Sequence, residues 1–287
     1  MTERNVSETI SIGSYTVHRL GFGAMRLTGE GVWGEHADPA RPGQVLRRAV
    51  ELGVDFIDTA DSYGPEVNER QIGETFGGAY PDGLVIATKA GFDRPGPGEW
   101  KVNGRPEHIR AACESSLQRL RLERIPLYQL HRIDPKVPVA ASIGAMLDLR
   151  REGKIEHIGL SEVSVAQLRE VQQMTRVVSV QNRYNVGDRE WDDVVDVCAA
   201  EGIAFIPWYP VGAGDLGAVG DMLDEVAGAH GTTRYVVALA WLLHRSPAMA
   251  PIPGTSSIAH LEENMSAATL VDRIAGAEWT RLDAAGT

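Results

Sequence analysis

The sequence is poor in cysteine, in aromatic residues and in positive charge. Its 287 residues include two cysteines, Cys113 and Cys198, which lie in helical patterns and show neither metal-type spacing nor a disulfide framework. We predict that both are packed thiols, and no metal site is expected. Aromatic residues make up 6% of the chain, and 39 acidic residues outnumber 28 basic ones, which gives a net charge of −11. This acidity argues against nucleic acid or an acidic membrane surface as a general partner.

Long apolar runs and a nucleotide-binding glycine turn are also missing. No apolar run is long enough to cross a bilayer, and the first residues lack the apolar core of a signal peptide, so a cytoplasmic protein is expected. No Gly-x-Gly-x-x-Gly turn follows the first predicted strand, which argues against a doubly wound sheet, the alternative fold. No break in composition divides the chain, so one domain over residues 1–287 is expected.

What the sequence does contain is a regular alternation of short apolar runs and helical patterns. Strands are predicted at 20–25, 55–58, 84–89, 125–131, 155–160, 177–181, 203–208 and 249–253. Helices are predicted at 39–53, 67–76, 106–121, 138–152, 164–174, 190–201, 219–229, 233–245 and 257–268, followed by a brief tail. A short hairpin is predicted at 11–17. Eight strand-then-helix units in a chain of this length predict an α/β protein with a single (β/α)8 TIM barrel and a short N-terminal hairpin.

Four polar residues lie at or just past the ends of three predicted strands, namely Asp58, Tyr63, Lys89 and His131. In a barrel, side chains at the carboxyl ends of the strands converge on the ligand site, where the turn-rich loops 93–105 and 211–217 are also expected. A free phenol has a pKa near ~10, and a nearby ammonium lowers it. A carboxylate would hold that ammonium in place, and an imidazole would polarise a carbonyl oxygen. For each residue alone a structural role is favoured, but the four together favour proton-transfer chemistry.

The motifs Asp-Thr-Ala-Asp-Ser-Tyr-Gly at 58–64, Thr88-Lys89 and Leu130-His131 resemble the signature of the aldo-keto reductases, and the resemblance spans nearly the whole chain. It implies a (β/α)8 barrel that binds a nicotinamide dinucleotide without a Rossmann turn. It also implies that Asp58, Tyr63, Lys89 and His131 form the catalytic tetrad, with Tyr63 as general acid in carbonyl reduction. The implied activity is NADPH-dependent reduction of a small aldehyde or ketone, with NADH less favoured.

The resemblance also implies a set of cofactor-binding residues. Ser161 and Gln181 would bond the nicotinamide carboxamide and Trp208 would stack on its ring, while Glu162 replaces an asparagine often found in the family. Residues 252–257 resemble the segment that holds the adenosine 2′-phosphate, but Gly254 and His260 stand where many relatives carry Lys or Arg. The full expected set is Gly23, Met25, Ser161, Gln181, Trp208, Tyr209, Gly254, Thr255, Ser256, Ser257, His260, Glu263 and Asn264.

Residues 23–29 and 31–34 resemble more closely a bacterial branch of the family that includes pyridoxal reductases. That likeness implies reduction of pyridoxal to pyridoxine, with Trp33, Phe92, Trp100 and Arg132 expected at the substrate. Two alternatives stand beside it: a ketoreductase that tailors a secondary metabolite or deoxysugar, and a non-catalytic nicotinamide-binding regulatory subunit. The complete tetrad disfavours the second of these. The oligomeric state is left open.

Overall fold

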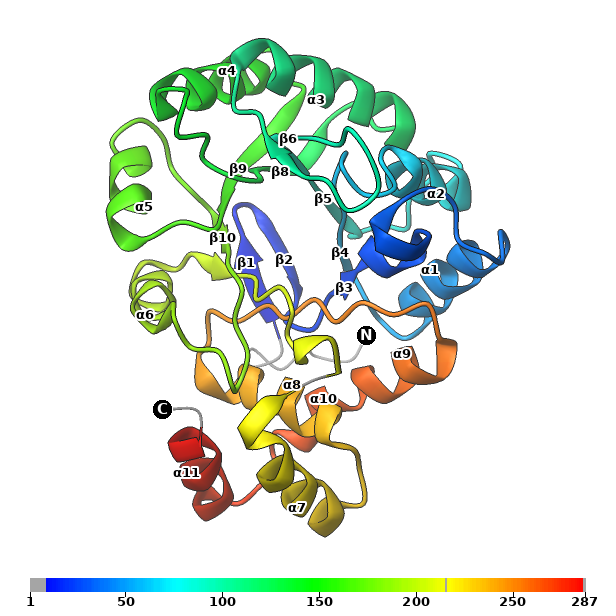
Figure 1. Cartoon of the computed structure of the whole chain (residues 1–287), viewed down its shortest axis with the longest axis vertical. Helices are drawn as coiled ribbons and strands as arrows, with labels where there is room; N and C mark the ends of the chain where they lie inside the picture. Colours follow the sequence, from blue (N-terminus) through cyan, green and yellow to red (C-terminus); the bar gives the residue numbers. More distant parts are fainter. Residues whose placement is uncertain (1–8, 215, 286–287) are drawn as a thin grey trace.

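Parallel strands form the inner wall of the molecule, and helices surround them (Figure 1). The computed structural model describes residues 9–214 and 216–285. Seven strands form one parallel sheet in the order β11-β10-β9-β8-β5-β4-β3. Their bounds are β3 Phe22–Gly23, β4 Phe56–Asp58, β5 Val85–Ala90, β8 Ile125–Leu130, β9 Ile155–Ser161, β10 Ser179–Gln181 and β11 Ala204–Phe205. The predicted (β/α)8 barrel is confirmed.

The helices alternate with the strands as the sequence predicts, and α1 to α8 each begin and end within a few residues of their expected places, while the helix predicted at 257–268 is divided into α9 and α10. Their bounds are α1 Arg41–Glu51, α2 Val67–Phe76, α3 Pro106–Leu120, α4 Val139–Arg151, α5 Val165–Gln172, α6 Asp192–Glu201, α7 Gly220–His230, α8 Arg234–Arg245, α9 Ile258–Met265, α10 Ala267–Leu270 and α11 Gly276–Ala285. Local signals explain several boundaries. Ser164 caps α5 in a capping box with Gln167, and Pro106 opens α3.

The eighth barrel position differs from the prediction of a strand at 249–253. This segment is extended and lies between β11 and β3, but it makes only irregular hydrogen bonds. Ala250 N–H donates to Phe205 O at 2.8 Å, and on the other side Gly21 N–H donates to Pro251 O at 3.0 Å. The two prolines of the segment have no N–H to donate, so a regular ladder cannot form although the ring is closed.

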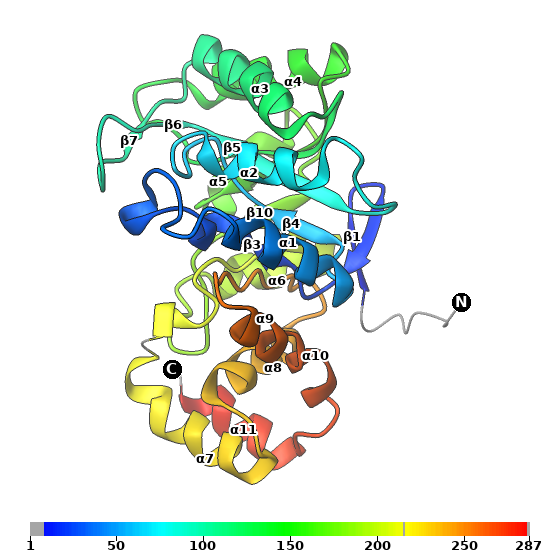
Figure 2. The ribbon, with the colours of Figure 1, turned by 90° about the vertical axis from the view of Figure 1, so that its right-hand side faces the viewer.

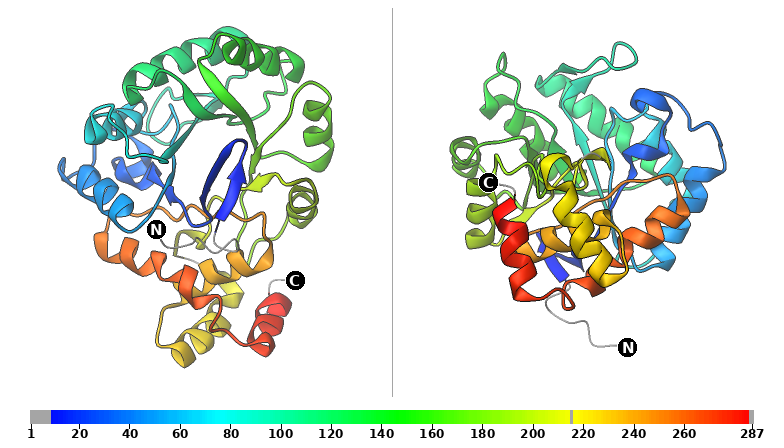
Figure 3. Two further views of the ribbon diagram at one scale, coloured as in Figure 1. Left: turned by 180° about the vertical axis from the view of Figure 1, so that it is seen from behind. Right: turned by 60° about the horizontal axis from the view of Figure 1, so that its bottom comes forward.

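The N-terminal hairpin plugs one end of the barrel. Strands β1 (Thr9–Ile12) and β2 (Tyr15–His18) pair antiparallel, as predicted. Ile12 and Val17 are fully buried against residues at the starts of the barrel strands, including Phe56. Seen from behind, the hairpin lies in front of the strand ring (Figure 3). Because this amino-terminal end is filled, access to the barrel interior is left to the carboxyl ends of the strands.

Two features were not predicted. The loop after β5 forms a small hairpin from β6 (Phe92–Asp93) and β7 (Lys101–Val102). The tail folds into α11, where the Trp279 ring stacks on His244 with 4.1 Å between centroids. Helices α7, α8 and α11 group at one end of the molecule (Figure 2).

The core contains both cysteines, and burial raises the pKa of each thiol to about 12. This agrees with the prediction that they are packed groups. Among the helices of residues 9–214 and 216–285, none combines the length and apolarity needed to cross a membrane.

Candidate active site

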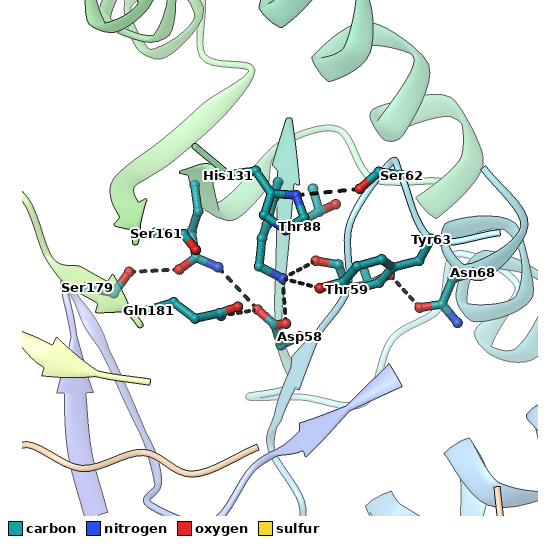
Figure 4. A network of polar contacts seen from close by, with 12 residues as sticks. Asp58, Thr59, Ser62, Tyr63, Asn68, Thr88, His131, Ser161, Ser179 and Gln181 are labelled. Carbon is teal, nitrogen blue, oxygen red and sulfur yellow. Dashed lines mark hydrogen bonds and ion pairs between the residues drawn. The ribbon is translucent and has the colours of Figure 1, made fainter. Parts of the chain in front are cut away.

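The barrel brings the four predicted strand-end residues together at the open end. Asp58 ends β4, Lys89 lies near the end of β5, His131 follows β8 directly, and Tyr63 lies in the turn after β4. Three of them, Asp58, Tyr63 and His131, line a cavity of about 490 Å³. Figure 4 shows the polar network around them.

Lys89 is the centre of this network. Its side chain is fully buried, and Nζ donates to Asp58 Oδ1 at 2.6 Å, to Thr59 O at 2.8 Å and to Tyr63 Oη at 3.3 Å. The other oxygen of Asp58 accepts from Gln181 Nε2 at 2.9 Å and from Gln129 Nε2 at 3.1 Å. Every donor of the ammonium and both oxygens of the carboxylate therefore have partners, which is what a buried ion pair requires.

This network fixes the protonation states of the phenol and the amine. Burial raises the pKa of Tyr63, and the opposing effect of the Lys89 ammonium does not outweigh it. The pKa expected from the sequence rested on the neighbouring ammonium alone. Burial lowers the pKa of Lys89, but Asp58 and Tyr63 together outweigh it, and the net direction is upward. At neutral pH the site thus holds a protonated phenol beside a charged ammonium.

His131 is held as a neutral imidazole. Burial, and then the positive charges of Lys89 and Arg132, lower its pKa well below the usual value. The ring lies edge-to-face with Tyr63, with centroids 5.9 Å apart, and with Phe92 at 4.8 Å. Its Nδ1 lies 3.5 Å from Ser62 Oγ (Figure 4). A neutral ring keeps one N–H donor and one acceptor, so it can orient a carbonyl group without carrying charge.

Seven of the residues expected at a cofactor line the cavity: Gly23, Met25, Ser161, Gln181, Trp208, Tyr209 and Gly254. The other six lie beyond its lining, in the turn before α9 or on α9 itself: Thr255, Ser256, Ser257, His260, Glu263 and Asn264. In that turn Ser257 caps α9, since its Oγ accepts from His260 N at 3.3 Å. Ser161 and Gln181 are held within the protein by Arg132 and Asp58 respectively.

Glu162 holds the indole that was expected to stack on a nicotinamide. Its Oε1 accepts from Trp208 Nε1 at 2.6 Å and from Arg183 N at 2.6 Å. Glu162 has φ +55°, in the left-handed region where asparagine is more common than glutamate. The replacement noted in the sequence therefore fixes the orientation of Trp208.

The substrate residues predicted from the sequence separate into two groups. Phe92, Trp100 and Arg132 line the cavity, whereas Trp33 does not. Arg94 lies between Trp33 and the cavity-lining Trp100: its guanidinium carbon is 5.5 Å from the Trp33 ring centroid and 3.6 Å from that of Trp100.

Several residues of this region were not predicted from the sequence, and three of them carry polar contacts or charge. Gln129 donates a hydrogen bond to Asp58, and Arg94 joins the loop after β5 to the turn at Ser62. Arg26 lines the cavity, and its side-chain stem lies beside Gly254. Gln129 had a recognisable signal, because it lies on the same predicted strand run as His131, two residues earlier. Arg26 follows Met25, which was predicted to contact the cofactor.

A (β/α)8 barrel whose open end holds a buried carboxylate–ammonium pair, a phenol and a neutral imidazole has the groups of a carbonyl oxidoreductase. The model of the Aldo/keto reductase family matches residues 19–286, and the chain belongs to this family of enzymes.

Its relatives include named enzymes. The chain is 46% identical over 279 residues to an uncharacterized oxidoreductase of Schizosaccharomyces pombe, which covers 97% of this chain and 90% of that protein. It is 40% identical over 270 residues to the pyridoxine 4-dehydrogenase of Escherichia coli, covering 92% and 94%. An aldo-keto reductase from Klebsiella pneumoniae, solved in complex with NADPH, superposes with a TM-score of 0.79 at 26% identity, over 96% of this chain and 94% of that one.

Proposed function

We propose that the protein reduces a small aldehyde or ketone with NADPH, and that pyridoxal is the favoured substrate. The observation that carries the proposal is the chain of contacts from Asp58 through Lys89 to the protonated phenol of Tyr63, beside the neutral ring of His131 in one cavity. The likeness to a pyridoxine 4-dehydrogenase and to a reductase solved with NADPH supports the substrate and the cofactor.

The cavity has the features that a nicotinamide dinucleotide needs. Trp208 presents an indole held in place by Glu162, and Gln181 and Ser161 supply an amide and a hydroxyl beside it. At the other side Gly23 and Gly254 leave a backbone surface without side chains, next to the N-terminus of α9. Free N–H groups and hydroxyls at a helix N-terminus suit a phosphate.

Arg26 adds a cation to that phosphate side. It is exposed, and its Cγ lies 3.6 Å from where a Cβ on Gly254 would be. Residues 254–260 contain no Lys or Arg. Arg26, beside Gly254, therefore supplies part of the charge that favours NADPH over NADH.

When bound, the cofactor supplies the hydride that adds to the carbonyl carbon. The protein supplies the proton: the Tyr63 O–H bond breaks as the carbonyl oxygen takes the proton, and a phenolate forms. Lys89 stabilises this phenolate at 3.3 Å, and Asp58 keeps the ammonium in position. His131 orients the carbonyl oxygen by a hydrogen bond, so the charge that develops on that oxygen meets a donor.

The test removes the proton donor alone. Tyr63→Phe should lower kcat by roughly 10²- to 10⁴-fold, because general acid catalysis contributes about that much. Quenching or enhancement of NADPH fluorescence should give an unchanged Kd, because the phenol is not a predicted cofactor contact. Tyr15→Phe is the matched control, since Tyr15 lies in β2 at the plugged end and bonds to Glu156.

Wild-type turnover by Tyr63→Phe would overturn the assignment of Tyr63. A panel of carbonyl compounds that includes pyridoxal, assayed with each cofactor, tests the substrate and the preference for NADPH. If neither NADPH nor NADH binds, the proposed function fails before any substrate is tried.

A further inference from the structure

Arg132 is a cation that lines the cavity, directly after His131 in the sequence. It is half-buried, and its guanidinium carbon lies 5.5 Å from the ring centroid of Phe92 and 6.0 Å from that of Trp208. Phe92, Trp208 and Arg132 all line the cavity. Its position next to the predicted carbonyl-orienting histidine places it close to wherever a carbonyl group binds.

The charge of Arg132 is not neutralised by a neighbouring acid. Its Nη1 donates to His131 O at 2.6 Å and to Ser161 Oγ at 3.0 Å, and both acceptors are uncharged. Within residues 9–214 and 216–285, no carboxylate oxygen lies within ion-pair distance of the guanidinium, and Nε and Nη2 have no hydrogen-bond acceptor. Burial lowers the pKa of Arg132, as expected for a cation removed from water without a counter-ion.

The nearest acid that influences Arg132 is occupied elsewhere. Glu162 raises the pKa of Arg132 through its charge, but its Oε1 already accepts from Trp208 and from the backbone of Arg183. Many guanidinium groups of the described chain pair with a carboxylate, as Arg119 does with Glu69 at 2.7 Å. Arg26 also lines the cavity, but it is exposed, whereas Arg132 is half-buried and directly follows the tetrad histidine.

We propose that Arg132 is a specificity-determining residue that selects carbonyl substrates with an anionic oxygen, a carboxylate or an ionised ring hydroxyl, a few bonds from the reacting carbon. The Nε and Nη2 donors, which have no acceptor within the described residues, are available to such an oxygen, and charge-assisted hydrogen bonds of this kind are stronger than neutral ones. The ring of Phe92 beside the guanidinium favours a planar, aromatic substrate. This inference rests on the proposed reduction and narrows its substrate class.

The test compares matched pairs of aldehydes that differ in one anionic group. For the carboxylate we choose 3-carboxybenzaldehyde against methyl 3-formylbenzoate, and for the ring hydroxyl, 3-hydroxypyridine-4-carbaldehyde against pyridine-4-carbaldehyde. The wild type should prefer the charged member of at least one pair by kcat/KM. Arg132→Gln should lower that preference by roughly 10- to 100-fold, the loss expected for hydrogen bonds to a charged group. Arg132→Lys, which keeps the charge, should retain part of it.

Binding without reaction gives a second measurement. Calorimetric titration of the NADP⁺-loaded protein with benzoate and with benzamide should show tighter binding of benzoate, and Arg132→Gln should remove the difference. Arg105→Gln is the matched control: Arg105 precedes α3 after the β6–β7 hairpin, is exposed, and pairs with Glu107 instead. It removes the same charge without touching the cavity.

The possible results separate the two proposals. A preference lost in Arg132→Gln and kept in Arg105→Gln supports the inference, and the pair in which it is lost identifies the anionic group. Equal preference in wild type and Arg132→Gln overturns the inference while carbonyl reduction stands. Absence of NADPH binding and of any reduction overturns the proposed function itself.

Discussion

Asp61, between two members of the tetrad, is a buried carboxylate with an incomplete set of partners. It is 8% exposed, and its Oδ1 has no hydrogen-bond partner in the described structure. Burial, and then the negative charge of Glu69, raise its pKa well above the usual value. A buried carboxylate with too few hydrogen-bond partners lowers the free energy of unfolding. The rest of the fold therefore has to stabilise the turn that carries Tyr63.

The first prediction concerns the pH dependence of stability. Because the pKa of Asp61 is raised on folding, the folded state binds this proton more tightly than the unfolded state. The contribution of Asp61 to the free energy of unfolding is therefore fully present below its pKa in the unfolded chain, ~3.9. It is lost as the pH rises through its higher pKa in the folded protein. Asp61→Asn, which cannot ionise, should be more stable than wild type at pH 8 by about 1–3 kcal/mol, and the difference should shrink at pH 5. Urea unfolding at both pH values measures it.

The control for Asp61→Asn is Asp82→Asn, because Asp82 is exposed in the turn before β5. It should change the free energy of unfolding little at either pH. If Asp61→Asn were less stable than wild type at pH 8, the carboxylate would have favourable partners that its burial does not reveal.

The residues that the sequence predicted well are those whose position follows from the strand pattern. Asp58, Lys89 and His131 follow buried apolar runs, so their convergence was fixed once the barrel was recognised. The roles of Arg94 and Glu162 could not be predicted in this way, because they depend on contacts with residues from distant segments, Ser62 and Trp208. The upward pKa of Tyr63 was missed for a similar reason: sequence shows the neighbouring charge but not the depth of burial.

At the scale of elements, the β6–β7 hairpin forms a wall of the cavity and is attached to the catalytic turn by one arginine. Arg94 Nη1 donates to Ser62 O at 2.6 Å, and Nε donates to Glu99 O at 2.9 Å. The same guanidinium lies 3.6 Å over the ring of Trp100. The hairpin was expected only as a turn-rich loop, because its two-residue strands are too short to leave a periodic pattern.

We predict that Arg94→Ala makes the β6–β7 hairpin more mobile. Without the guanidinium, the hairpin loses its hydrogen bond to Ser62 O and Trp100 keeps, to that turn, only its ring contact with Tyr63, so residues 92–103 should exchange amide hydrogens faster. KM for the carbonyl substrate should rise by roughly tenfold, the equivalent of about 1.4 kcal/mol or one to two hydrogen bonds, and kcat should change less. Hydrogen exchange followed by mass spectrometry and steady-state kinetics measure the two effects.

Lys101→Ala is the control for the hairpin, since Lys101 is an exposed residue of β7. It should leave both exchange and KM near wild type. Unchanged exchange over residues 92–103 in Arg94→Ala would show that the hairpin is held by its own pairing and not by the arginine.

At the scale of the whole molecule, the barrel closes at a seam where β3 meets the extended segment 249–253 after α8. Gly23 N–H donates to Pro253 O at 3.4 Å across it. A Cβ on Gly23 would lie 2.6 Å from Ile252 O, and a Cβ on Gly254 would lie 2.6 Å from Gly23 O. Both obstacles are backbone atoms, which cannot rotate away as a side chain would. The lack of side chains at Gly23 and Gly254 therefore explains both features: it lets the ring close, and it leaves bare backbone on the cavity surface.

The last prediction follows from that shared cause. Gly254→Ala should push the seam apart, lower the free energy of unfolding by about 1–3 kcal/mol as overpacked sites do, and weaken NADPH binding as well. Gly144→Ala should have the opposite sign: Gly144 lies within α4 with nothing near its added Cβ, and alanine in a helix interior is more stable by about 0.5–1 kcal/mol. Urea unfolding and NADPH fluorescence compare the two. If Gly254→Ala kept wild-type stability while losing NADPH, the glycine would serve the cofactor alone, and the seam would tolerate the methyl group.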